Sequence, residues 1–497
     1  ESPDSIVLEV VLEIVTMPSR RQFLYLSTLA TLGALTSQCS RRINQPSLPP
    51  REIWRSTEGQ LQVTLTAQVQ TIRLGDRRAQ VLTYNGQVPG PQLEVRPGDR
   101  VEIELINQLA ESTNLHFHGL HIPPTGTADN IFLAVPPGAS QTYRFVVPAD
   151  HPGGLFWYHP HYHGRVAAQV FGGLAGTIVV RSELDDRPEF KDAVEAIAVL
   201  QDFDLDPQGR VREPLPMLRM WGRRGDLITL NGAAPGQTLT VPQAGLLRLR
   251  LLNAAASRFY QLQLQDHPWY LVGTDGGAVS RPIAQDKVIL APGNRVDMHI
   301  PGTANPTQTN ALRSLPYEPG FMAMANMIAM ANSGLGAIDQ EPQVLAQLTY
   351  GNRQPVALPA TLMPVEPLPE PAVTREFVLD HGIDAATGDP FLINGRAYGH
   401  GRIDTQVTLG TVEDWVLVNQ AGLDHPFHLH TNAFQVVARN GKMVSDRDRQ
   451  WLDVVNIPAY ETVTIRIPFR DYPGQTVYHC HVLDHEDQGM MGVIAMT

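Results

Sequence analysis

The sequence predicts an all-β protein built from three β-sandwich domains. One strand-rich segment occurs three times along the chain, and the 497 residues include 40 prolines and 41 glycines. Pro and Gly favour turns and short strands over long helices, and a length of roughly 150 residues per domain fits three domains. We expect helices only near 191–199 and 322–332.

Each repeated segment begins at an Asn-Gly pair and ends at a second asparagine. The pairs start at Asn85, Asn231 and Asn394, and the Asn-to-Asn spans are 22, 22 and 25 residues. Asn-Gly favours the tight turn of a β-hairpin. The strands that follow alternate in polarity, as in Val-Glu-Ile-Glu-Leu at 101–105, which places apolar side chains on one sheet face. We therefore expect three sandwiches, at 55–183, 190–350 and 372–497.

Short polar or proline-rich stretches separate these domains. Residues 184–188 read Leu-Asp-Asp-Arg-Pro, and residues 355–371 contain six prolines. A proline-rich stretch of this kind is typical of an extended, semi-rigid linker.

Residues 1–54 read as an N-terminal extension, an export signal and a linker. Arg20 and Arg21 precede an apolar run at 23–35 that has no acidic residue. This is the layout of a signal peptide, and the arginine pair resembles a twin-arginine export signal. The run is too short to span a membrane, so we expect an exported, periplasmic or extracellular protein with no stable membrane span. Met17 is the expected natural start, and Cys39 fits a discarded leader better than a lipid-attachment site.

Composition excludes several classes of protein. A net charge of −12 argues against binding nucleic acid, which needs clustered Lys and Arg. Two cysteines cannot form a disulfide scaffold or a cysteine-rich zinc or iron–sulfur site. The 17 histidines become informative through their positions.

Ten of the 17 histidines fall in four short clusters, two in the first repeat and two in the third. The clusters begin at His116, His159, His425 and His479. Residues two apart on a strand point to the same face, so each His-x-His offers two imidazoles to one side, and eight could hold several metal ions. Cys480 points the other way, and one Cys, two His and a weak axial Met form a blue-copper electron-transfer site. The residues available for that site are Cys480, His425, His485 and Met490.

With these motifs the sequence resembles the multicopper oxidases, whose domains are cupredoxin-like Greek-key β-sandwiches. The resemblance implies a laccase-like enzyme with four copper ions, namely one type 1 ion, one type 2 ion and a type 3 pair. Such an enzyme passes electrons from a reduced substrate to O₂ and releases water. The implied type 1 ligands are His425, Cys480, His485 and axial Met490; the implied type 2 ligands are His116 and His428; the implied type 3 ligands are His118, His159, His161, His430, His479 and His481.

The resemblance also implies where this chemistry lies. The three-copper cluster would lie between the first and third domains, and the middle domain would be a spacer that borders the substrate side. Cys480 would carry electrons to the cluster through its two neighbouring histidines. Asp129 and Glu486 resemble the acids that deliver protons in the family. We expect His121 and His163 to support the ligands or lie at the surface, and structural roles for His151, His267, His299, His381 and His400.

The sequence leaves the reducing substrate open. Phenols and aromatic amines are the leading expectation, and Cu(I), Fe(II) or Mn(II) are the alternative. Asp424 could hydrogen-bond a phenol or guide a cation. One run of methionines could bind Cu(I), because soft thioethers suit this ion. The favoured interpretation is that the run forms an apolar cover over a cleft or core. Its members are Met322, Met324, Met327 and Met330.

Other classes of function explain the sequence less well. A plain electron carrier or copper store needs only the type 1 site, which would leave eight histidines unexplained. A structural protein that has the fold without copper, as in an exported cell-division relative, conflicts with the intact ligand motifs. The third repeat and the ligand positions disfavour two-domain nitrite reductases. We expect a monomer whose partners are O₂ and a small reducing substrate.

Overall fold

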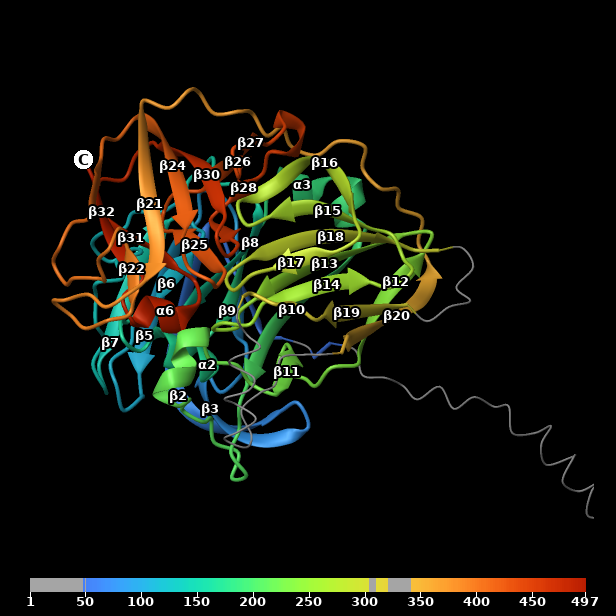
Figure 1. Ribbon diagram of the computed structural model, residues 1–497. Helices are drawn as coiled ribbons and strands as arrows, with labels where there is room; N and C mark the ends of the chain where they lie inside the picture. The colour runs from blue at the N-terminus through green and yellow to red at the C-terminus, as the bar shows by residue number, and fades with distance from the viewer. Residues whose placement is uncertain (1–47, 50, 304–309, 321–340) are drawn as a thin grey trace, which may run out of the picture. The chain divides into compact units, whose positions relative to one another are not determined.

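The computed structural model describes residues 48–49, 51–303, 310–320 and 341–497. The expected export signal, Cys39 and the helix at 322–332 with its methionine run lie outside these residues. Within the described chain, strands far outnumber helices and form six sheets (Figure 1). The all-β prediction is confirmed.

The first two sheets lie within residues 53–180 and share one core. Their strand orders are β1-β4-β9-β8-β6 and β3-β2-β5-β7. Leu65, Ile103 and Tyr158 are fully buried between them. The strands are β1 (Ile53–Arg55), β2 (Gln60–Leu74), β3 (Arg77–Tyr84), β4 (Gly90–Val95), β5 (Arg100–Asn107), β6 (His116–His118), β7 (Ser140–Val146), β8 (Gly154–His159) and β9 (Gly176–Val180).

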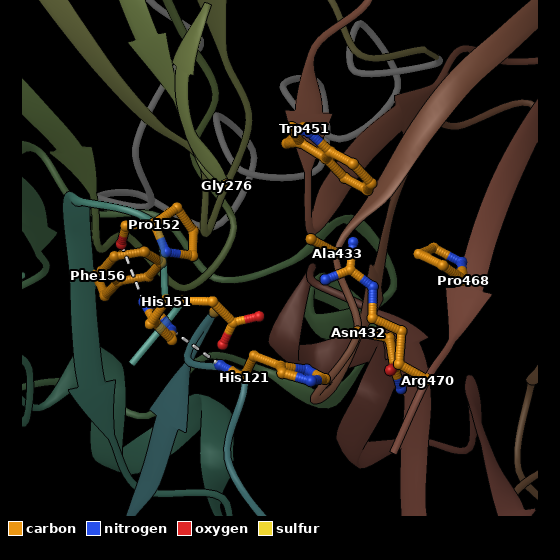
Figure 2. A pocket seen from close by; sticks show the side chains of 12 residues that line it. His121, His151, Pro152, Phe156, Gly276, Asn432, Ala433, Trp451, Pro468 and Arg470 are labelled. Atoms are coloured by element: carbon orange, nitrogen blue, oxygen red, sulfur yellow. Dashed lines mark hydrogen bonds between the residues drawn. The ribbon is translucent and has the colours of Figure 1, made fainter. Parts of the chain in front are cut away.

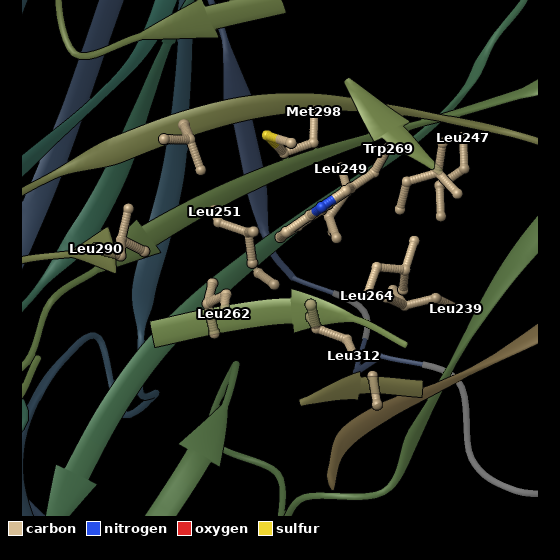
Figure 3. Close-up of a cluster of buried hydrophobic side chains, with 14 of the residues drawn as sticks. Leu239, Leu247, Leu249, Leu251, Leu262, Leu264, Trp269, Leu290, Met298 and Leu312 are labelled. Carbon is tan, nitrogen blue, oxygen red and sulfur yellow. The ribbon is translucent and has the colours of Figure 1, made fainter. Parts of the chain in front are cut away.

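The next two sheets lie within residues 194–353, in the orders β11-β10-β13-β18-β15-β16 and β12-β20-β19-β14-β17. Leucines from both sheets surround Trp269 and Met298 in their common core (Figure 3). The strands are β10 (Val194–Phe203), β11 (Leu227–Leu230), β12 (Gln237–Gln243), β13 (Leu246–Asn253), β14 (Tyr260–Leu264), β15 (Trp269–Thr274), β16 (Gly277–Gln285), β17 (Val288–Leu290), β18 (Arg295–Pro301), β19 (Ala311–Leu315) and β20 (Gln343–Arg353).

The last two sheets lie within residues 373–496. One has the order β22-β21-β24-β30-β26-β27 with β28 paired to β26, and the other is β23-β32-β31-β25-β29. Trp415, Phe427 and Ile465 are buried between them. The strands are β21 (Val373–His381), β22 (Phe391–Ile393), β23 (Thr405–Val407), β24 (Thr411–Asn419), β25 (His425–Leu429), β26 (Phe434–Arg439), β27 (Lys442–Met443), β28 (Trp451–Leu452), β29 (Val454–Ile457), β30 (Thr462–Phe469), β31 (Gly474–Cys480) and β32 (Met491–Met496).

The helix predicted at 191–199 is wrong, because most of this stretch belongs to strand β10. β10 pairs in parallel with β13 and antiparallel with β11, and its residues from Ile197 onward are buried. Parallel strands covered on both faces are rich in apolar and β-branched residues. Pairing with two neighbours thus overrides the local helix preference of the alanines and Glu195.

The repeated asparagines occupy equivalent places in the three sandwiches. The first asparagine of each repeat has a φ of 51° to 53°, the left-handed conformation that an Asn-Gly turn requires. The second asparagine ends a strand, donates its side-chain amide to two backbone carbonyls and accepts from the N–H two residues later. The sequence repeat is therefore a structural repeat, at Asn107, Asn253 and Asn419.

The helices are short and several of them lie where the sandwiches meet. Helix α6 contacts α2 and the 3₁₀ helix η1, and Leu483 of α6 packs in one buried cluster with Phe171 and Ala256. No helix among the described residues is long and apolar enough to cross a membrane. The helices are α2 (Val166–Phe171), α3 (Glu183–Asp186), α4 (Pro188–Lys191), η1 (Pro216–Trp221), η2 (Asp446–Asp448) and α6 (Leu483–Asp487).

Candidate metal centre

Strands of the first and third sandwiches bring eight of the predicted ligand histidines together. His116 on β6 lies opposite His159 on β8, and His428 on β25 lies opposite His479 on β31. Because side chains alternate along a strand, His116 and His118 on β6 send their rings to one side, whereas the second histidine of each other motif lies just beyond the end of its strand. All eight are buried, with exposed fractions of 0–1%: His116, His118, His159, His161, His428, His430, His479 and His481.

The eight rings form a tight cluster. The Nε2 atom of His479 lies 3.1 Å from Nε2 of His161 and 3.1 Å from Nε2 of His430. A second group of rings, those of His118, His159 and His481, has centroids 5.1 to 5.8 Å apart. His116 and His428 remain, with centroids 5.8 Å apart. These sets are in contact with one another, because His116 stacks on His430 and His118 stacks on His428, each with centroids 3.8 Å apart, so the eight rings form one continuous cluster.

Hydrogen bonds at one ring nitrogen orient the other nitrogen into the cluster. Nδ1 of His159 lies 3.0 Å from the Pro160 carbonyl, and Nδ1 of His428 lies 2.7 Å from the Asp453 carbonyl. A carbonyl can only accept, so each Nδ1 carries the proton and donates. Nε2 then carries a lone pair, and in both rings it has no hydrogen-bond partner. Buried lone pairs that converge without hydrogen-bond donors fit a cation. A hydrogen bond from the other ring nitrogen to a carbonyl is typical of a metal-ligating histidine.

Burial also keeps seven of these rings in the form that binds metal. Desolvation, together with neighbouring histidines, lowers the pKa of His116 well below its usual value, and desolvation lowers the pKa of His159 to about 3. Desolvation is likewise the main cause that lowers the pKa of five further rings. Neutral imidazole is a ligand suited to copper. The five further rings are those of His118, His161, His428, His430 and His481.

A separate buried site surrounds Cys480. Its Sγ lies 3.4 Å from Nδ1 of His425 and 3.8 Å from Nδ1 of His485, and these two nitrogens are 3.4 Å apart. Met490 is fully buried, and its carbonyl accepts a hydrogen bond from the Cys480 N–H at 3.0 Å. Desolvation raises the pKa of the Cys480 thiol, so a bound cation must displace the thiol proton to gain a thiolate.

The chain links this site directly to the histidine cluster. Cys480 groups with His425 and His485, whereas His479, the residue before it, groups with His161 and His430. His481, the residue after it, belongs to the cluster as well. Two metal-binding regions are thus joined by single peptide units on either side of Cys480.

Both predicted acids touch cluster rings. Asp129 accepts a hydrogen bond from the Phe117 N–H at 2.8 Å and lies 2.9 Å from Nδ1 of His116. Desolvation raises the pKa of Asp129 to about 8. Glu486 is fully buried, with Oε2 at 3.1 Å from Nδ1 of His479 and Oε1 at 3.5 Å from Nε2 of His161.

Other residues considered from the sequence lie outside the ligand groups. His121 bonds the Thr431 carbonyl and the Asp471 carboxylate, and His163 packs on Tyr398. Asp424 has both carboxylate oxygens engaged, because it accepts from Tyr317, Asn456 and the Ala459 N–H. It is therefore part of an internal hydrogen-bond network.

Two residues near these sites escaped the sequence reasoning, and a third, His381, was expected only in a structural role. His381 lies edge-on to the ring of His425, with centroids 5.3 Å apart. Asp453 contacts His118 at 3.0 Å, and Arg295 of the middle sandwich donates to Asp453. Arg295 and Asp453 are 158 positions apart in the sequence. The only local sign of a role for Asp453 was that it is a single acidic residue before an apolar run. No local sequence pattern indicated a role for Arg295.

A cavity of about 220 Å³ lies beside the histidine cluster. Figure 2 shows Phe156 and His151 of the first sandwich on one side, and Trp451 and Arg470 of the third on the other. Gly119, which directly follows the cluster residue His118, is part of the wall. The cavity therefore approaches the cluster to within one residue of the chain.

Comparison with known proteins identifies the family. Sequence models of multicopper oxidases match residues 66–185, 211–313 and 369–497. A multicopper oxidase, mco, of Staphylococcus aureus is 28% identical over 426 residues, which is 84% of each chain. The cell division protein FtsP of Photorhabdus laumondii is 30% identical over 505 residues and covers 95% of this chain and 98% of its own.

Solved structures agree with this assignment. The multicopper oxidase from Campylobacter jejuni, described as a metallo-oxidase, has a TM-score of 0.77 and 29% identity over 91% of this chain and 98% of that one. The laccase-like multicopper oxidase CueO from Ochrobactrum sp. has a TM-score of 0.76 and 25% identity over 90% of this chain and 100% of that one. The predicted cupredoxin-like sandwiches are confirmed, and the chain belongs to the multicopper oxidase family.

Proposed function

We propose that this protein is a four-copper oxidase that couples one-electron oxidation of a small reductant to the reduction of O₂ to water. The observation that carries the proposal is the set of buried, neutral imidazoles whose lone pairs converge beside a separate Cys-His-His site. Copper, when bound, would supply the one-electron chemistry and the site at which O₂ takes up four electrons. The chain's own residues hold the ions, admit electrons and deliver protons.

We assign the ligands as the resemblance to the multicopper oxidases implies. His425, Cys480, His485 and Met490 would hold the type 1 copper, and His116 and His428 would hold the type 2 copper. The two groups of three imidazoles hold the type 3 pair: His118, His159 and His481 in one group, and His161, His430 and His479 in the other.

Electrons enter beside helix η1 of the middle sandwich. The Met220 carbonyl of η1 lies 3.0 Å from Nε2 of His485, so the edge of the type 1 site is covered by this helix. Arg223 secures the segment, because its guanidinium makes a buried ion pair with Asp484 of α6 at 2.8 Å. Met217 is 57% exposed. A reductant bound on η1 would therefore reach His485 through the Met220 carbonyl.

Protons reach the cluster through the two buried acids. Glu486 contacts the group that contains His161 and His479, and Asp129 contacts His116. Positioned carboxyl groups transfer protons to reduced oxygen species. Burial keeps Asp129 protonated near neutral pH, with a pKa of about 8, so it can donate. The cavity beside Gly119 is our proposed route for O₂.

We propose phenols and aromatic amines as the leading substrates. Cu(I), Fe(II) or Mn(II) form the second candidate class, which the metallo-oxidase from Campylobacter jejuni favours at 29% identity. The exposed Met217 and Met220 on η1 also favour Cu(I), because soft thioethers bind it. A role in cell division alone, as the name of FtsP indicates for that protein, would leave the converging histidines without a purpose.

The test is oxygen uptake by the copper-loaded protein with a phenol and with Cu(I) as alternative reductants. An intense blue absorption with a near-ultraviolet shoulder is expected, and its absence would contradict the four-copper proposal. If Cu(I) oxidation dominates and falls in Met324→Leu and Met327→Leu, the metallo-oxidase alternative is correct. We also propose export through the twin-arginine signal and a monomeric state, which fractionation and sedimentation would check.

A further inference from the structure

Arg295 extends from the middle sandwich to the edge of the histidine cluster. It lies on β18 and is 1% exposed. Its two terminal nitrogens donate to the two carboxylate oxygens of Asp453, each at 2.6 Å. The carbonyls of Leu155, Gly293 and Asp275 accept from the guanidinium at 3.0, 3.0 and 2.9 Å. All five N–H donors of the guanidinium are therefore used, and its position is fully determined.

Asp453 in turn orients one ring from each of two proposed copper sites. Its Oδ1 lies 3.0 Å from Nε2 of His118, and its carbonyl accepts from Nδ1 of His428 at 2.7 Å. The two rings are stacked, with centroids 3.8 Å apart and planes at 6°. The other nitrogen of each ring has no hydrogen-bond partner and faces the cluster. A displacement of Asp453 would turn both rings together.

The surroundings leave this contact little freedom to shift. Asp275 accepts from the Arg295 N–H at 2.6 Å and from Asn294 at 2.8 Å, and Asn294 donates to the Val454 carbonyl at 3.1 Å. A Cβ placed on Gly119 would collide with the Arg295 guanidinium and with Asp453. Residue 453 is thus held from the middle sandwich on one side and the first sandwich on the other.

We propose that Arg295 is a positioning residue for the copper cluster, through which the middle sandwich, which contributes none of the proposed ligands of that cluster, fixes the ligand rings. The inference rests on the proposed function. A planar fork that donates to both oxygens of a carboxylate sets its orientation, which a point charge cannot do. The middle sandwich therefore helps to orient the ligand rings of the cluster and is more than a spacer.

The test compares Arg295→Met with Arg250→Met in the copper-loaded protein. Arg250 is also fully buried in the middle sandwich and ion-paired, with Asp185 at 2.8 Å, but it contacts no ligand histidine. Loss of a residue that orients metal ligands typically weakens metal binding about 10–100-fold. We expect Arg295→Met to weaken cluster copper by this factor against a competing chelator. The near-ultraviolet shoulder should fade first, while the blue absorption persists. Arg250→Met should retain cluster copper like the wild type.

Arg295→Lys provides a variant that keeps the charge if Arg295→Met does not fold. Its copper retention should lie between the wild type and the loss expected for Met, because the fork is gone. Retention equal to the wild type in either variant, or equal weakening in Arg250→Met, would overturn the inference. Failure of the wild type to bind cluster copper would instead overturn the proposed function, so the two failures are distinguishable.

Discussion

Replacing Glu486 by Gln tests the proposed route of protons to the cluster. The substitution keeps the size of the side chain and removes its exchangeable acid. Glu486 is completely buried and lies 3.1 Å from His479 and 3.5 Å from His161. Among the described residues, no other carboxylate lies within ion-pair distance of this group of three histidines. Asp129 contacts His116, so it is not placed to replace Glu486.

The structure sets the size of the expected effect. A positioned acid contributes about 10²–10⁴-fold to a rate that depends on proton transfer. At about 1.36 kcal/mol per tenfold change, the loss corresponds to about 2.7–5.4 kcal/mol in the activation barrier. Because burial excludes bulk water and no other carboxylate of the described residues lies within ion-pair distance of these histidines, we expect turnover of Glu486→Gln to fall at least about 100-fold.

Steady-state oxygen uptake and anaerobic bleaching of the blue absorption measure the two halves of the reaction. Glu486→Gln should slow oxygen uptake and leave the rate of bleaching unchanged, since electrons enter without protons at that site. Asp487→Asn is the matched control: its carboxylate accepts from the N–H groups of Gly164, Val166 and Ala167 at 2.7 to 3.2 Å and contacts no ligand histidine. Oxygen uptake by Glu486→Gln within twofold of the wild type would refute the reasoning.

Three further predictions concern colour, stability and pH. Cys480→Ser should abolish the blue absorption and nearly all turnover while the near-ultraviolet shoulder persists, because only the type 1 site loses its thiolate; absorption spectra check this. Arg223→Met should lower the free energy of unfolding by about 3–5 kcal/mol, because Asp484 is left buried without its partner. Arg77→Met, which removes an exposed ion pair, should lower the free energy of unfolding by at most about 1 kcal/mol. Equal urea midpoints for Arg223→Met and Arg77→Met would contradict this prediction. Burial lowers the pKa of His159 to about 3 and also lowers the pKa of the nearby His116, His118 and His481. The copper-free protein should therefore lose stability as the pH falls below about 6.5, where only the unfolded chain takes up protons. A urea midpoint that rises on acidification would show the opposite sign.

The sequence was sufficient for the parts of the site that depend on strand periodicity. A His-x-His on a strand must present both rings to one side, so the pair at 116 and 118, both on β6, could be placed without coordinates. The Asn-Gly turns also carried enough local information to reveal three equivalent sandwiches. These features depend on neighbours in sequence, and local patterns report them well.

Features that depend on distant partners were beyond the sequence. β10 is a strand because β11 and β13 lie on either side of it, and its own residues did not favour that conformation. The hydrogen bond of Asp424 with Tyr317 joins residues 107 positions apart. The pairing of Arg295 with Asp453 likewise has no periodicity or spacing that announces it. Such contacts arise from the packing of whole sandwiches against one another.

The copper content of the purified protein, measured together with its absorption spectrum, tests the central claim most directly. The proposed function predicts about four copper ions per chain, an intense blue absorption from the Cys480 site and a near-ultraviolet shoulder from the histidine cluster. About one ion per chain with blue colour alone would indicate an electron carrier. A folded protein that binds no copper at all would indicate a structural role, and either result would contradict the account.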